Sequence, residues 1–262
     1  MSQIELTIHN AVAKVTLNRP EVHNAFNDDV IRSLIECFDR VENDDKIRVM
    51  VLQSTGKSFS SGADLNWMKK MAAYSEAENL ADAQQLALMF SKLYHLSKPT
   101  IARVQGSAFG GAVGLVACCD IAIATRLSKF CLSEVKLGLV PATISPYIVE
   151  SVGPRIAKRL FMTAEVISAR RARRIGLISE AVSEDELDND INNIINALLK
   201  NGPKAVSMAK SLVNEIAYKP IDSHLSEFTS NKIAAVRVSS EGQEGLTAFL
   251  DKRKASWVDS HD

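Results

Sequence analysis

The residues 108–120, AFGGAVGLVACCD, place two glycines where a predicted strand ends and a predicted helix begins. The first N–H groups of a helix have no partner within the helix and carry the positive end of its dipole. Glycine lets a ligand oxygen approach such a backbone closely. Gly110 and Gly111 therefore indicate a site for an oxyanion or a phosphate. The alternative is that these glycines only permit tight packing of the strand on the helix.

A second stretch has the same character. Residues 58–65, SFSSGADL, also follow a predicted strand and lead into a predicted helix, for which Asp64 is a candidate N-cap. Small residues such as Ser61 and Ala63 leave the backbone N–H groups free to face a cavity. Two such turns could converge on one oxygen atom, and each donor aimed at a developing oxyanion contributes about a hundredfold or more to a rate.

A third stretch contributes a candidate acid. Glu134 lies in FCLSEVKLGLVPA (130–142), at the end of a predicted short strand and among apolar residues. A carboxyl group in that place is either a solvated acid at a strand end or a general base in a dry pocket with a raised pKa. The residues by themselves leave both interpretations open.

The elements that must position these residues alternate between strand and helix. Strands are predicted at residues 4–18 (a hairpin), 47–54, 100–106, 120–125, 129–134 and 177–182. Helices are predicted at 28–44 (capped by Asn27), 66–96 in one or two pieces, 203–218 and 244–257, and helices dominate after residue 145. Strand signals near residues 14, 50 and 102 are each followed by a helix, which is typical of stacked turns of an α/β solenoid. A doubly wound sheet would need a GxGxxG turn after the first strand, and the sequence has none there.

Composition narrows the classes of function. The chain has 262 residues with 31 basic and 31 acidic side chains, which argues against nucleic acid or an anionic membrane as its main partner. The N-terminus lacks a signal-peptide pattern and no apolar run is long enough to cross a bilayer, so we expect a soluble, cytoplasmic protein. The cysteines lack metal-ligand spacing and suit a reducing compartment, so no metal is expected. They are Cys37, Cys118, Cys119 and Cys131.

Taken together, six stretches resemble the enoyl-CoA hydratase/isomerase (crotonase) family in order and spacing, over nearly the whole chain. They are NRPEVHNAF (18–26), GKSFSSGADL (56–65), GSAFGGAVGLVACCDIAIA (106–124), SEVKLGLVPA (133–142), ARRARRIGLISEAV (169–182) and EGLTAFLDKRKASW (244–257). The resemblance implies a ClpP-like α/β spiral of repeated β-β-α turns over residues 1–195, which holds an acyl-CoA site. It further implies a C-terminal helical region, 196–262, that assembles a homotrimer or a hexamer built as a dimer of trimers.

The resemblance also implies roles for the residues above. The N–H groups of Ala63 and Gly111 match the pair that holds the thioester oxygen of an acyl-CoA and stabilises its enolate. Glu134 matches one of the two glutamates of the family's hydratases, whereas the other would fall at Gly114 and is absent. A hydratase would then use Glu134 both to activate water for attack on Cβ and to return a proton to Cα. The alternatives are a Δ3,Δ2-enoyl-CoA isomerase, in which Glu134 carries a proton between C2 and C4, and a non-catalytic acyl-CoA-binding protein.

Two details favour the hydratase and a branched substrate. SSGADLNWMKKMA (60–72) and GLVPATISPYIV (138–149), with Gly114 between them, are similar to the bacterial methylglutaconyl-CoA hydratases of leucine breakdown. Gly114 is expected to leave room for a branched or carboxylated acyl chain. No separate cofactor is implied, because coenzyme A is part of the substrate.

The remaining matches concern coenzyme A. His23, Ala25, Ser61, Asp64 and Leu65 match positions along the pantetheine and adenine, together with Gly110 beside the oxyanion turn. Phe249 and Lys252 match a pair on the terminal helix that often reaches the adenine and phosphate end from a neighbouring subunit; otherwise they are a core residue and a solvated lysine. Trp67 and Met68 either line the acyl pocket or belong to the core. ARRARR (169–174) lacks interleaved aromatic residues and is predicted to be a solvated helix face rather than a nucleic-acid site.

Overall fold

The apolar, β-branched runs of the sequence form a six-stranded sheet in a computed structural model that describes residues 2–258. Its strands occur in the order of the sequence: β1 (Ile4–His9), β2 (Val12–Leu17), β3 (Val49–Ser54), β4 (Thr100–Val104), β6 (Ile121–Thr125) and β9 (Glu180–Val182). The β1–β2 hairpin is antiparallel and every later pair is parallel. A smaller sheet contains β5 (Ala108–Phe109), β7 (Lys129–Cys131) and β8 (Ile167–Ser168).

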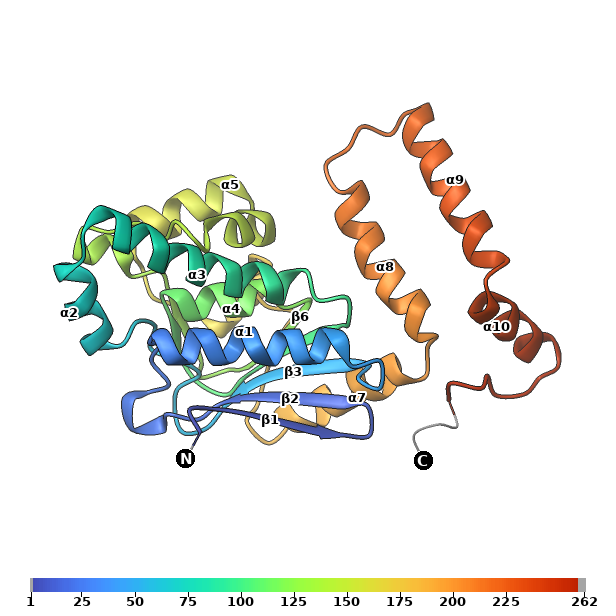
Figure 1. Ribbon diagram of the computed structural model, residues 1–262, viewed down its shortest axis with the longest axis horizontal. Helices are drawn as coiled ribbons and strands as arrows, with labels where there is room; N and C mark the ends of the chain where they lie inside the picture. The colour runs from blue at the N-terminus through green and yellow to red at the C-terminus, as the bar shows by residue number, and fades with distance from the viewer. Residues whose placement is uncertain (1, 259–262) are drawn as a thin grey trace.

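Helices cover both faces of the large sheet (Figure 1). The helices of the described residues are α1 (Asp28–Asn43), α2 (Leu65–Ala73), α3 (Glu76–Tyr94), α4 (Gly111–Cys118), α5 (Ser145–Thr163), α6 (Ala169–Arg174), α7 (Leu187–Leu199), α8 (Pro203–Ile216), α9 (Ser223–Arg237) and α10 (Ser240–Leu250), with the 3₁₀ helices η1 (Pro20–Val22) and η2 (Glu134–Leu137). The main core lies between the sheet and α1, α3 and α4. On the opposite face α7 packs Leu187 and Ile191 against Val49, Val51 and Ile101. The α/β class and the repetition of strand and helix are confirmed.

The topology brings three loops together. Because β2, β3 and β4 are parallel neighbours, the chain leaves all three at the same edge of the sheet. The loops that follow them, 18–27, 55–64 and 105–110, therefore lie side by side. A carboxyl edge of this kind is where open parallel sheets bind ligands.

Two of the predicted elements next to the three loops differ from those observed. The helical stretch 66–96 is divided at Tyr74 into α2 and α3, because Ser75 caps α3 through a reciprocal capping box with Glu78. The strand predicted at 129–134 ends at Cys131, and Glu134 instead begins η2. This turn ends at Gly138, whose left-handed φ of 72° stops the helical backbone.

The C-terminal helices α8, α9 and α10 extend to one side of the sheet (Figure 1). The expected boundary at residue 195 falls inside α7, whose buried face belongs to the core. Helix α10 ends at Leu250, so the predicted helix 244–257 is shorter than expected. Large apolar side chains remain exposed on these helices, among them Val213, Phe249 and Leu250. Across residues 2–258, the helices are either too short or too polar to span a bilayer.

Candidate active site

A cavity of about 680 Å³ opens at the carboxyl edge where the three loops meet. Its volume falls in the range of small-molecule sites. Residues from the loops, from α2 and from η2 line it: Val22, His23, Ala25, Ser61, Gly62, Ala63, Asp64, Leu65, Asn66, Met68, Lys69, Met71, Gly110, Ser133, Glu134, Leu137 and Leu139. The two glycine-containing turns and the acid selected from the sequence therefore lie at one cavity.

The two turns touch through their backbones. The Phe109 N–H donates to the Ser60 carbonyl oxygen at 3.0 Å. Gly62 has a φ of 91°, and a Cβ atom there would lie only 2.9 Å from the Phe109 carbonyl oxygen. Glycine is thus required at position 62 for both its conformation and this close approach. Gly110, with a φ of 54°, then directs the chain into α4.

The N–H groups of Ala63 and Gly111 have no acceptor among the hydrogen bonds of residues 2–258. Phe26 binds both neighbours of Ala63, because its N–H donates to Gly62 O and its carbonyl accepts from Asp64 N, each at 2.7 Å. Since successive peptide groups of an extended chain point to opposite sides, the Ala63 N–H points away from Phe26. Gly111 is the first residue of α4, where an N–H has no partner within the helix. Both groups are therefore available to an external acceptor.

Glu134 is half-buried beside these donors. Its Oε1 would lie 3.3 Å from a Cβ atom placed on Gly110, so the carboxyl group faces the turn. Its Oε2 is buried without a hydrogen-bond partner in the described part of the chain. Burial raises the pKa of Glu134, because desolvation disfavours the charged form. This environment differs from that of a solvated acid at a strand end.

Gly114 does not leave the space that the sequence suggested. A Cβ atom on Gly114 would lie 2.2 Å from Ile144 Cγ2 and 3.0 Å from Phe90 Cε1. Ile144 and Phe90 are themselves fully buried. Apolar side chains thus fill the space beside residue 114, and the expectation that this glycine makes room for the acyl chain is wrong.

Sequence reasoning missed the residue that ties the first loop to the second. Arg19 lies two residues after the end of β2 and donates to the Ala25 carbonyl at 2.7 Å and to Asp64 Oδ2 at 3.0 Å. Asp64 also caps α2 by accepting from the Asn66 N–H. Although burial raises the pKa of Asp64, the hydrogen bonds from Asn66 and Arg19 outweigh burial and lower it. Asp64 is therefore ionised, and its hydrogen bonds hold this part of the cavity wall in place.

Asn24 is a second missed residue. It is buried with a φ of 55°, and its side-chain amide donates to the carbonyls of Thr55 at 2.8 Å and Ser58 at 3.0 Å. An Asn-Ala tip after a proline signals a loop, and asparagine tolerates the left-handed region. That local signal could have identified Asn24, whereas the partners of Arg19 depend on the tertiary fold.

The other predicted residues divide into two groups. His23, Ala25, Ser61, Leu65 and Met68 line the cavity, and His23 Nδ1 is 3.2 Å from Ser58 Oγ. Trp67 instead lies in the core, where its Nε1 donates to Asp82 Oδ1 at 3.1 Å. Phe249, on α10, is 81% exposed and Lys252 follows that helix; neither lines the cavity of its own chain.

These features define an α/β protein whose loops present unpaired backbone donors and one half-buried carboxyl group to a single cavity. The sequence profile of the enoyl-CoA hydratase/isomerase family matches residues 7–260, so the chain belongs to that family.

Individual relatives cover nearly the full chain. The crotonyl-CoA hydratase of Syntrophomonas wolfei is 34% identical over 249 residues, which are 94% of each chain. The short-chain-enoyl-CoA hydratase of Clostridium acetobutylicum is 33% identical over 97% of each chain. The crystal structure of an enoyl-CoA hydratase from Shewanella pealeana has a TM-score of 0.95 at 43% identity, covering 98% of this chain and 96% of that one. The expected crotonase spiral is thereby confirmed.

Proposed function

We propose that this protein is an enoyl-CoA hydratase that adds water across the C2=C3 bond of a 2-enoyl-CoA. The observation that carries the proposal is the meeting of the Ala63 turn, the Gly110–Gly111 turn and Glu134 in one cavity. Relatives named as crotonyl-CoA and short-chain-enoyl-CoA hydratases support it.

In the proposed mechanism the thioester oxygen accepts hydrogen bonds from the N–H groups of Ala63 and Gly111. The Glu134 carboxylate removes a proton from a water molecule, whose oxygen bonds to C3. The π electrons of the double bond move toward the thioester oxygen, and the two donors and the α4 dipole stabilise the enolate. The protonated Glu134 then gives its proton to C2, which completes the addition of one water. The raised pKa of Glu134 suits a group that must accept and return a proton.

One carboxyl group performs both proton transfers in this proposal. Position 114 has no carboxylate, and Ile144 and Phe90 occupy the adjacent space. A second carboxylate is therefore absent from that position. Glu134 is left as the acid that faces the oxyanion turn.

We further propose a branched, carboxylated acyl chain such as that of 3-methylglutaconyl-CoA. Gly114 does not provide space for this acyl chain, so the proposal rests on other residues of the cavity. Met68, Met71 and Leu139 give the cavity an apolar wall, and Lys69 lines it without an ion pair among the described residues. Lys69 is a cation that a terminal carboxylate of the acyl chain could meet.

Coenzyme A is proposed to lie along His23, Ala25, Ser61 and Leu65, outward from the oxyanion turns. We propose a homotrimer, alone or paired as a hexamer, in which Phe249 and Lys252 of one subunit serve the site of another. The exposure of Phe249 and the other apolar side chains of α8–α10 supports this assembly.

The central test follows the loss of enoyl-thioester absorbance with crotonyl-CoA and 3-methylglutaconyl-CoA. Glu134→Gln should lower kcat by about 10²–10⁴-fold with little change in KM, because it removes acid–base chemistry and keeps the shape. Glu36→Gln, an exposed carboxyl group on α1, is the matched control and should keep wild-type rates. If neither substrate gains water while a 3-enoyl-CoA becomes conjugated, the protein is an isomerase. Acyl-CoA binding without any turnover would mean a binding protein.

The substrate proposal has its own test. Lys69→Met should raise KM for 3-methylglutaconyl-CoA about tenfold or more and leave crotonyl-CoA nearly unchanged, because only the first substrate carries a terminal carboxylate. Lys70→Met on the same helix is the control, since Lys70 pairs with Asp28 outside the cavity lining. Equal losses with both substrates would assign Lys69 to the coenzyme A part instead.

A further inference from the structure

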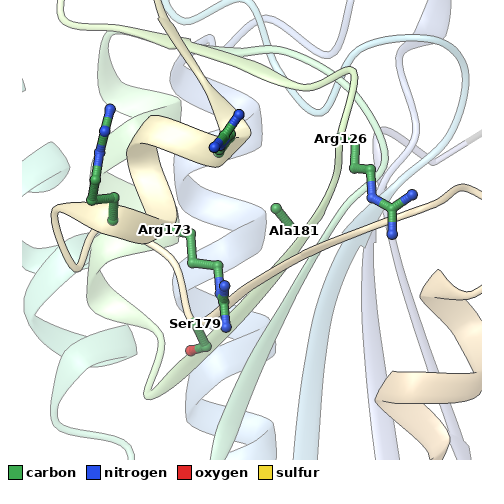
Figure 2. A pocket seen from close by; sticks show the side chains of 6 residues that line it. Arg126, Arg173, Ser179 and Ala181 are labelled. Atoms are coloured by element: carbon green, nitrogen blue, oxygen red, sulfur yellow. The ribbon is translucent and has the colours of Figure 1, made fainter.

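A second cavity, of about 640 Å³, shares no lining residue with the first. Figure 2 shows its lining, in which Ala181 lies between Arg126 and Arg173 in the view. Four of its six lining residues are arginines: Arg126, Arg170, Arg173 and Arg174, with Ser179 and Ala181. We call it the arginine pocket. The predicted solvated face of ARRARR is exposed, as expected, but three of its side chains share this hollow with a fourth arginine.

Separate elements build the arginine pocket. Arg170, Arg173 and Arg174 come from α6, whereas Arg126 directly follows β6. Ser179 directly precedes β9 and Ala181 lies within it; among the described strands β9 is the last of the large sheet and pairs with β6 alone. The Arg126 N–H donates to the Val182 carbonyl at 2.7 Å, which fixes the backbone of Arg126 to this strand. The pocket thus joins a helix to the free edge of the sheet.

The charges of the pocket are only partly compensated. Arg173 forms an ion pair with Glu180 at 2.9 Å, and Arg126 is 3.6 Å from Glu186. Arg170 and Arg174 have no acidic partner among the ion pairs of residues 2–258, while Arg171, which does not line the pocket, is paired with Glu165. Two positive charges are therefore left without partners around one hollow. Like charges that line one pocket repel each other, and a bound anion reduces that repulsion.

We propose that the arginine pocket binds the diphosphate group of a small phosphorylated ligand. Arginine presents several N–H donors in a planar fork that matches phosphate oxygens. A diphosphate carries enough charge to meet both Arg170 and Arg174, and the pocket has the volume of a small-molecule site. Nucleic acid is disfavoured because no aromatic residue lines the pocket and the chain has no net charge.

The test is calorimetric titration of the full-length protein with inorganic pyrophosphate at low salt. Wild type should show saturable binding below about 1 mM that weakens as salt is added. The double variant Arg170→Gln/Arg174→Gln should bind about tenfold or more weakly, because it removes both unpaired cations. Arg155→Gln/Arg237→Gln, which removes two exposed arginines elsewhere, has the same net charge and should bind within about twofold of wild type. Arg170→Gln/Arg174→Gln should hydrate crotonyl-CoA at a rate within about twofold of wild type. The arginine pocket shares no lining residue with the cavity at the carboxyl edge.

The source of the diphosphate is resolved by comparing pyrophosphate, ADP and AMP. A diphosphate site is supported if ADP and pyrophosphate bind, AMP does not, and Arg170→Gln/Arg174→Gln weakens the binding of both ligands. Absence of binding, or equal losses in both double variants, would overturn the proposal. An RNA oligonucleotide that binds more tightly than ADP, with affinity that grows with its length, would assign the arginines to nucleic acid instead and would also overturn it.

Discussion

The two cavities of this protein have similar volumes and opposite construction. The cavity at the carboxyl edge is shaped by backbone: its donors are peptide N–H groups, and its turns touch at Gly62 and Phe109. The arginine pocket is shaped by long, exposed side chains on a six-residue helix and beside an edge strand. Peptide groups held by hydrogen bonds are fixed before a ligand arrives, whereas arginine side chains lose rotamer freedom on binding.

The difference separates sites for chemistry from sites for binding. Stabilising an enolate needs donors that are already in place when charge develops. Holding an anion needs only enough opposite charge within reach. Substitutions at the first cavity should therefore change rates through the backbone, and substitutions at the second should change affinity and leave rates alone.

Among variants that change the construction of the two cavities, the largest expected effect comes from forcing apart the two backbone turns. Gly62→Ala would place a Cβ atom 2.9 Å from the Phe109 carbonyl oxygen and should lower kcat about a hundredfold by moving the Ala63 N–H. The measurement is steady-state hydration of crotonyl-CoA, with folding checked by circular dichroism. Gly138→Ala is the matched control, because Gly138 has a φ of 72° but nothing within 4 Å. Equal losses in the two variants would show that backbone strain, and not the close approach, sets the rate.

Next in size is the packing beside the missing acid. Gly114→Ala should destabilise the protein by about 1–3 kcal/mol, because its Cβ atom would overlap Ile144 Cγ2. Adding Ile144→Leu removes that γ2 branch and should recover part of the loss. Adding Ile144→Val keeps the branch and should recover none. Urea unfolding of the single and double variants measures the coupling, and an equal recovery with leucine and valine would contradict the contact.

A smaller effect is expected on protein stability, because Glu134 is a half-buried carboxyl group. Its pKa is raised in the fold, so its contribution to stability is most favourable below the unfolded pKa of about 4.3 and is lost as pH rises through the folded pKa. Glu134→Gln should therefore raise Tm by a few degrees at pH 8, and by less at pH 5. Glu36→Gln should shift Tm little at either pH. Thermal unfolding at the two pH values checks this, and a gain that grows toward pH 5 would reverse the sign of the argument.

The smallest effect is expected at the arginine pocket without ligand. Arg170→Gln/Arg174→Gln should stabilise the protein by a few tenths of a kcal/mol at low salt, because it relieves repulsion between exposed like charges. The gain should vanish at high salt. Urea midpoints at the two salt concentrations measure it. A loss of stability would mean that these arginines pack rather than repel.

Sequence patterns correctly predicted the parts of the site that depend on local structure. The glycines, the cap at Asp64 and the strand–helix order could be read because each depends on a few neighbouring residues. Ile144 could not be assigned to the space beside Gly114, since thirty residues separate them and only the packing of α4 against α5 brings them together. The same holds for Arg19, whose partners lie in two different loops.

The orientation of side chains was the second property of the site that the sequence could not predict. Trp67 follows the oxyanion loop directly, yet α2 turns it into the core while its neighbour Met68 faces the cavity. On a helix, adjacent residues point about 100° apart, so proximity in sequence to a site does not give access to it. Phe249 shows the reverse case, because this apolar position on an amphipathic helix stays exposed and does not join the core.

The strand order of the large sheet has a consequence for synthesis. Its strands stand in the sheet in the same order as in the sequence, from β1 to β9. As the chain leaves the ribosome, each new strand can therefore join the existing edge, and no strand has to be inserted between two that have already paired. The outer edge of β1 stays unpaired throughout, while the opposite edge passes to each new strand in turn and finally belongs to β9. Charged side chains near an edge discourage pairing with another chain. The arginines beside β9 therefore place positive charge at that edge of the finished sheet.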